Sequence, residues 1–150
     1  MKSTLEQVGA ASLFLFFTLD LERRVQKPDE SDVGIRVLKT LITFFIMGLA
    51  AISIMTLWQM PLLLACVLCF LAWLKRLLFP IKWELLWFLV VGYMGATAET
   101  LIIQAGAWTY TNPQWNGIPI WLPAIWGLTA TSLMTAYSAV ASEMKQQTHP

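Results

Sequence analysis

Long apolar segments separated by short polar stretches dominate this chain. Four of them approach or reach the length of about 20 residues that a helix needs to cross the hydrocarbon core of a bilayer. They cover residues 37–58, 61–79, 83–104 and 119–141, the second only if Lys75 and Arg76 extend their charged ends toward the interface. The pattern predicts an all-α, polytopic transmembrane helix bundle, a single membrane domain of about four spans over residues 1–150.

The N-terminal segment, residues 3–24, has a different pattern. Ser3 and Glu6 have the spacing of a helix capping box, and the apolar run that follows them ends at Leu19. That run is shorter than a full span, which favours an amphipathic helix lying in the membrane interface. A fifth spanning helix is the alternative. We expect residues 25–36 to form a cytoplasmic linker and residues 142–150 a cytoplasmic tail.

The positions of lysine and arginine predict the orientation. They fall before the first clear span, between the second and third, and after the fourth: Arg23, Arg24, Lys27, Arg36, Lys39, Lys75, Arg76, Lys82 and Lys145. The connections around Gln59 and over residues 105–118 contain none. Because cytoplasmic loops carry the excess of basic residues, both termini are predicted in the cytoplasm, in an inner (plasma) membrane.

Composition supports a membrane protein and narrows the chemistry. Of the 150 residues 57% are hydrophobic and 13% are charged, against about 25% charged in soluble domains. The net charge of +1 argues against nucleic-acid binding. Cys66 and Cys69 have CxxC spacing but lie in an apolar run with no histidine nearby. We therefore predict no metal and no cofactor.

Glu99 is the only acid that we expect inside the hydrocarbon region. An ionisable group there is costly, which makes it a candidate for function. Small residues precede it on one face of its helix, where a neighbouring helix could approach closely: Gly92, Gly95 and Ala96. The fourth span offers a matching strip of small and hydroxyl residues: Gly127, Thr131, Thr135 and Ser138. Counting depth along both helices predicts that Glu99 faces Trp126 and Gly127.

These residues predict a lipid-accessible cleft near the outer leaflet, capped by the aromatic loop that contains Trp115. Glu99 is the candidate catalytic residue. The candidate ligand-binding residues are Gln104, Trp108, Tyr110, Trp121, Trp126 and Thr131. The alternative is structural: a protonated Glu99, hydrogen-bonded to Thr131 or to a backbone carbonyl, holds helices together. The aromatic residues would then form an ordinary interfacial belt.

Residues 92–135 resemble the membrane proteins of carotenoid biosynthesis, namely the hydratases of acyclic carotenoid ends and the membrane lycopene cyclases. The resemblance rests on two blocks, Glu99-x6-Gly106-x-Trp108-x-Tyr110 and Gly117-Ile118-Pro119-x3-Pro123-x2-Trp126. It implies a long apolar substrate, such as an isoprenoid, that enters from the lipid. It also implies that Glu99 protonates a carbon–carbon double bond, with Trp108, Tyr110 and Trp126 steadying the carbocation.

Two functions follow as hypotheses. The first is binding or modification of an isoprenoid or another membrane lipid at Glu99 and the aromatic loop. The second is a non-enzymatic helper or assembly subunit, whose small-residue faces pack against partner helices in a homo- or hetero-oligomer. Because a lone Glu99 would lack a partner base, the sequence supports a binding cleft more than it supports catalysis, and it leaves open whether the protein is an enzyme.

Overall fold

The computed structural model describes residues 33–147, with side chains as far as Ala139. This part of the chain contains four helices and no named strand: α2 (Val33–Leu57), α3 (Pro61–Leu78), α4 (Glu84–Gln104) and α5 (Leu122–Gln147). The all-α prediction is confirmed for these residues. The predictions for residues 3–24 and for most of the linker lie outside the described residues.

The helix bounds differ most from the expected ones at the two outer spans. Helix α2 begins at Val33 and so includes Arg36, which was assigned to the linker. Helix α5 begins at Leu122 and continues to Gln147, rather than covering residues 119–141. Pro119 precedes the helix and its carbonyl accepts a hydrogen bond from the Leu122 amide. Pro123 occupies the first turn, where a missing amide donor costs least.

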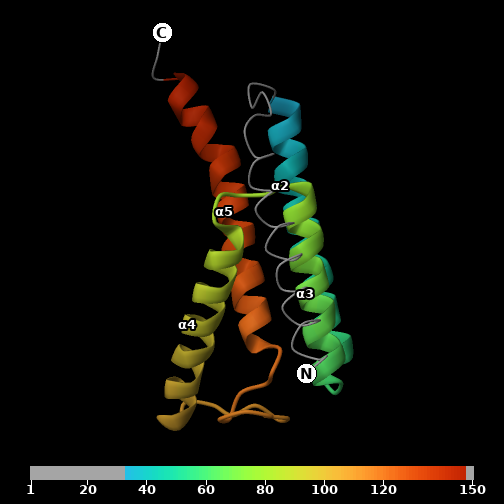
Figure 1. Cartoon of the computed structure of the whole chain (residues 1–150), viewed down its shortest axis with the longest axis vertical. Helices are drawn as coiled ribbons and strands as arrows, with labels where there is room; N and C mark the ends of the chain where they lie inside the picture. Colours follow the sequence, from blue (N-terminus) through green and yellow to red (C-terminus); the bar gives the residue numbers. More distant parts are fainter. Residues whose placement is uncertain (1–32, 148–150) are drawn as a thin grey trace, which may run out of the picture.

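Helix α5 lies at the centre of the bundle. It packs against α2, α3 and α4. Helix α2 also packs on α3, whereas α3 and α4 make few contacts with each other. Figure 1 shows the four helices running alongside one another, with α2 and α3 as an antiparallel hairpin. The core is built from buried apolar residues of all four helices and of the 105–121 loop, among them Ala50, Leu64, Ala96, Ile118 and Leu128.

Three helices, α2, α3 and α4, are long and apolar enough to cross a membrane. The molecule is thus built as a membrane protein. Helix α5 is less apolar, because it carries buried hydroxyl residues such as Thr131, Ser132 and Thr135. Those hydroxyls are covered by neighbouring helices, so α5 does not need to be as apolar as a helix that faces lipid.

The two ends of the bundle differ in character. One end, which we call the basic end, holds the start of α2 and the connection from α3 to α4, with Arg36, Lys39, Lys75, Arg76 and Lys82. The other, the loop end, holds the connection of residues 58–60 and the longer loop of residues 105–121 (Figure 1). Neither connection at the loop end contains lysine or arginine.

Candidate functional site

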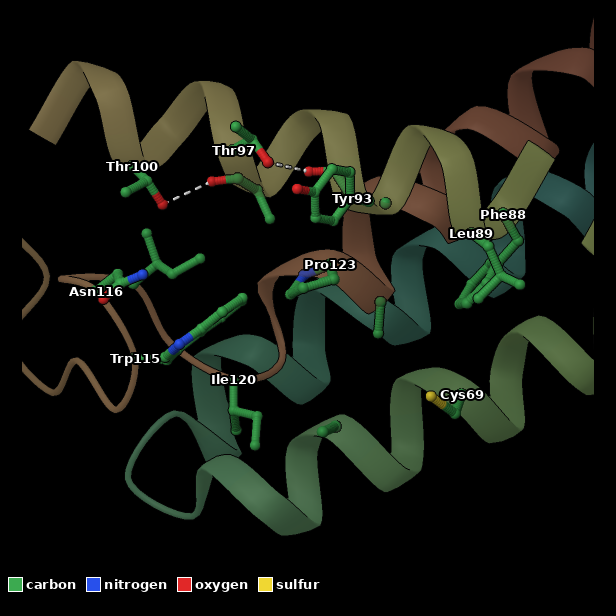
Figure 2. A pocket seen from close by; sticks show the side chains of 15 residues that line it. Cys69, Phe88, Leu89, Tyr93, Thr97, Thr100, Trp115, Asn116, Ile120 and Pro123 are labelled. Carbon is green, nitrogen blue, oxygen red and sulfur yellow. Dashed lines mark hydrogen bonds between the residues drawn. The ribbon is translucent and has the colours of Figure 1, made fainter. Parts of the chain in front are cut away.

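A groove of about 510 Å³ lies between α3 and α4 (Figure 2). The first turn of α5 forms its floor, and residues of the 105–121 loop close one end. The lining residues are Ala65, Cys69, Phe88, Leu89, Gly92, Tyr93, Ala96, Thr97, Thr100, Trp115, Asn116, Ile118, Ile120, Pro123 and Ala124. None of them is charged. The groove therefore offers an apolar surface with a few neutral polar groups.

Glycines bring α4 and α5 into backbone contact beside the groove. A Cβ atom on Gly92 would lie 2.6 Å from the carbonyl oxygen of Pro123, and one on Gly127 would lie 2.5 Å from that of Phe88. Real side chains do not fit at such distances. Gly92 and Gly127, one from each of the two predicted small-residue strips, thus form a close helix contact, and this contact holds α4 on α5 while the α3 side of α4 stays open.

A tight hairpin shapes the loop end of the groove. The backbone amide of Trp115 donates to the carbonyl of Ile118 over 3.0 Å, and the Ile118 amide donates back over 2.8 Å. Between them Asn116 and Gly117 both have positive φ, 46° and 85°. Asn-Gly is the preferred pair for such a two-residue turn, because both positions require the left-handed region. The buried Ile118 anchors the hairpin, so Trp115 and Asn116 are held at the end of the groove.

Glu99 lies outside the groove lining, in a small polar cluster with two aromatic residues of the loop. The Tyr110 hydroxyl donates to Oε2 of Glu99 over 3.3 Å. The Tyr110 ring meets the buried Trp121 ring edge-on, with centroids 6.3 Å apart. Burial, and then the charge and hydrogen bond of Glu99, raise the pKa of Tyr110 to about 12. Tyr110 is therefore a neutral donor at physiological pH, and Glu99 is a fixed acceptor at the loop end.

The predicted position of Glu99 opposite Gly127 is wrong, and Trp126 lies against a glycine one turn before Glu99 on α4. The Trp126 ring packs directly on Gly95, and Gly127 lies against Phe88. The error comes from the register of α4 against α5. Because Gly92 faces Pro123 at the start of α5, the last three turns of α4 extend past that helix. Loop residues fold back along those turns to cover them.

Three other candidate residues, Thr131, Trp108 and Gln104, are not part of the cluster around Glu99. Thr131 is fully buried, and its hydroxyl donates to the carbonyl of Gly127 over 3.0 Å. Its hydroxyl is therefore not the hydrogen-bond partner of Glu99 that the structural alternative named. Trp108 and Gln104 are both exposed at the loop end. The structure thus brings together Glu99, Tyr110 and Trp121, and none of the seven candidate residues lines the groove.

A buried ion pair near the basic end was missed from the sequence. Nζ of Lys75 lies 2.6 Å from Oε1 of Glu84, and the two side chains are 0% and 4% exposed. Lys75 also donates to the carbonyl of Thr131 over 3.0 Å, and Oε2 of Glu84 accepts from the Ile81 amide. Lys75 is thus buried between helices rather than extending its charged end outward, and Glu84 is an acid buried inside the bundle. This pair connects α3, α4 and α5.

Among residues 33–147, no three His, Cys, Asp or Glu side chains are grouped in a way that could hold a metal ion. Comparison of the chain with protein-family models, with curated proteins and with solved structures found no match. The chemistry of the groove and of the two polar clusters is therefore the basis for a functional proposal.

Proposed function

We propose that this protein binds the apolar chain of a membrane lipid or isoprenoid in the groove between α3 and α4. The observation that carries the proposal is the groove itself. Its volume of about 510 Å³ is within the range of roughly 300–1,000 Å³ typical of small-molecule sites. Its two walls are helices of membrane-spanning length and composition, so a ligand would enter sideways from the bilayer.

The shape of the groove favours a chain over a partner helix. A helix with its side chains is about 10–12 Å across and would continue past the loop end in order to cross the membrane. The groove is closed there by Trp115 and Ile120 and is floored by Pro123. A flexible lipid chain can end where the groove ends. The resemblance of residues 92–135 to carotenoid-biosynthesis proteins makes an isoprenoid one candidate for that chain.

The proposal is limited to binding. Glu99 is the acid that the resemblance assigns to proton transfer, and it is absent from the residues that line the groove. Its carboxylate accepts a hydrogen bond from Tyr110 instead. In this proposal Glu99 holds the loop against the last turns of α4, and so keeps the end of the groove in place.

We also propose that the protein is a multi-pass protein of the inner (plasma) membrane with its basic end in the cytoplasm. Support comes from the distribution of charge between the ends. Arg36, Lys39, Lys75, Arg76 and Lys82 lie at one end, and the connections at the other end contain no basic residue. The positive-inside rule then assigns the loop end to the outer face.

The two cysteines of α3 provide a matched test of the groove. Both side chains are exposed on the surface of α3, but only Cys69 lines the groove. Cys69→Trp would fill the groove, and Cys66→Trp adds the same bulk to another part of the helix surface. We expect native mass spectrometry of detergent-extracted protein to show bound lipid on the wild type and on C66W. Retention on C69W should fall by about tenfold, equivalent to about 1.4 kcal/mol.

Equal lipid retention by C69W and C66W, or no bound lipid on any of the three proteins, would overturn the proposal. Copurification of a stoichiometric polypeptide in place of lipid would instead favour the helper or assembly-subunit function. In that case C69W and C66W would be compared for loss of the partner.

A further inference from the structure

The groove runs along most of α4. Along α4 its lining runs from Phe88 and Leu89 to Thr100. The twelve residue steps from Phe88 to Thr100 correspond to about 18 Å at 1.5 Å per residue. A bilayer's hydrocarbon core is about 30 Å thick, so the groove covers only part of a span, from the second turn of α4 (Glu84–Gln104) to near its loop end.

The polarity of the lining changes along this length. The end of the groove away from the hairpin is formed by Cys69, Phe88 and Leu89 (Figure 2). The loop end has neutral polar groups on both sides: Thr97 and Thr100 on α4, and Trp115 and Asn116 on the hairpin. A lipid in the groove would therefore lie with its polar end at the hairpin and its chain along α4 toward Phe88.

The charge distribution selects against an anionic head. Residues 40–74 and 83–144, which include every lining residue, contain no lysine or arginine. The ionisable side chain next to the polar end is the carboxylic acid of Glu99, adjacent in sequence to Thr100. A phosphate or carboxylate head would therefore find no counter-charge from these segments.

The hydrogen-bonding groups at the polar end select for a hydroxyl. The hydroxyl of Thr97 donates to the carbonyl of Tyr93 over 2.8 Å, and that of Thr100 donates to Ala96 over 2.9 Å. Each oxygen still has a lone pair to accept from a ligand. The Asn116 amide provides both a donor and an acceptor. A hydroxyl can donate to a threonine oxygen and accept from the amide at once, whereas a ketone or an ester cannot donate.

We infer that the groove takes an uncharged long-chain alcohol, with its hydroxyl between Thr97, Thr100 and Asn116. This inference rests on the proposed function and names the ligand class of the same groove. It also gives the hairpin a role. The Asn116-Gly117 turn with its two positive φ angles holds an amide at the point where the alcohol ends.

Three ligands that share one chain test the head group: oleyl alcohol, oleate and the matching alkene. The full chain, purified in detergent, is titrated with each, and bound ligand is measured by native mass spectrometry. We expect the alcohol to bind about tenfold more tightly than oleate, because the anion loses its hydration without gaining a counter-charge. The alkene should bind about threefold to tenfold more weakly than the alcohol, as the loss of one or two net hydrogen bonds implies.

Variants that remove the polar groups of the lining identify the polar end. Thr97→Val together with Thr100→Val removes both acceptors, and Asn116→Gly removes the amide while keeping a residue that tolerates positive φ. Each should weaken alcohol binding about threefold to tenfold and leave alkene binding unchanged. Thr56→Val is the control: its hydroxyl makes the same bond to the carbonyl four residues earlier, on α2 and away from the groove.

Two outcomes separate this inference from the proposed function. If oleate binds as tightly as the alcohol, or if T97V/T100V weakens the alkene equally, the hydroxyl assignment is overturned and the lipid groove remains. If none of the three ligands binds and C69W behaves as C66W, the groove is not a lipid site and both proposals fail.

Discussion

At the scale of single residues, the Lys75–Glu84 pair is the most demanding arrangement in the described part of the molecule. Two charged side chains are buried among helices, at a desolvation cost of several kcal/mol each. Each charged group makes a second hydrogen bond, in addition to the ion pair, that offsets this cost. Lys75 also donates to the Thr131 carbonyl, and Glu84 also accepts from the Ile81 amide. Removing one member of the pair should therefore destabilise the fold more than removing both charges.

A double-mutant cycle tests this coupling. Lys75→Met alone leaves the Glu84 carboxylate buried without its ammonium partner, and we expect it to lower the free energy of unfolding by about 3–5 kcal/mol. Adding Glu84→Gln removes the stranded charge and keeps an acceptor for the Ile81 amide. The double variant K75M/E84Q should therefore be more stable than K75M. Unfolding in detergent, followed by circular dichroism, measures all four proteins, and strictly additive losses would contradict the coupling.

The sequence contained both residues but could not pair them. Lys75 and Glu84 stand on either side of the short connection between α3 and α4, where charges usually mark the membrane boundary. Whether such a lysine turns outward or inward depends on what lies behind it. Here the Thr131 carbonyl of α5 accepts a hydrogen bond from Lys75, and the two residues are 56 positions apart in the chain. A pattern of local hydrophobicity carries no information about it.

At the scale of helices, three glycines differ sharply in their surroundings. Cβ atoms on Gly92 and Gly127 would meet backbone atoms at 2.6 and 2.5 Å, whereas one on Gly48 would meet nothing within 4 Å. A flexible side chain can move aside, but a backbone carbonyl cannot move without shifting its helix. The distance between α4 and α5 is therefore set by Gly92 and Gly127.

Alanine substitutions turn this difference into a measurement. Gly127→Ala should lower the free energy of unfolding by about 1–3 kcal/mol, because α4 and α5 must separate. Gly48→Ala on α2 makes the same chemical change in open space and should raise it by about 0.5–1 kcal/mol, the difference in helix propensity. Detergent unfolding of the two variants beside the wild type gives both values. Equal effects would show that the contact of α4 with α5 is looser than described.

The sequence predicted the helices and the small faces that join α4 to α5, because hydrophobic length and residue size are local properties. It did not predict the register, since that depends on how the 105–121 loop folds back on α4. The groove was missed for the same reason. Its polar end includes Trp115 and Asn116, which reach it only through the hairpin. The Asn116-Gly117 pair was the available signal, as Asn-Gly marks a tight two-residue turn.

At the scale of the whole molecule, the two ends of the bundle carry different structural features. The basic end joins helices through a buried ion pair and carries the residues that favour one orientation in the membrane. The loop end carries the groove and the Glu99–Tyr110 contact, with no basic side chain in its connections. Helix α5 connects them, since it packs against each of the three apolar helices (Figure 1).

The orientation of these ends can be tested by labelling single cysteines in intact cells with a membrane-impermeant maleimide. Asn112 is exposed in the loop of residues 105–121, and Asn112→Cys should be labelled from outside. A cysteine added after Pro150 should react only after the membrane is opened, because the positive-inside rule keeps the basic end in the cytoplasm. The wild type controls for Cys66 and Cys69, which lie within α3. Labelling of the added cysteine but not of N112C in intact cells would reverse the orientation.

Ser3→Cys then decides between the two interpretations of residues 3–24: outside labelling means a fifth span, and protection means an interfacial helix on the cytoplasmic face.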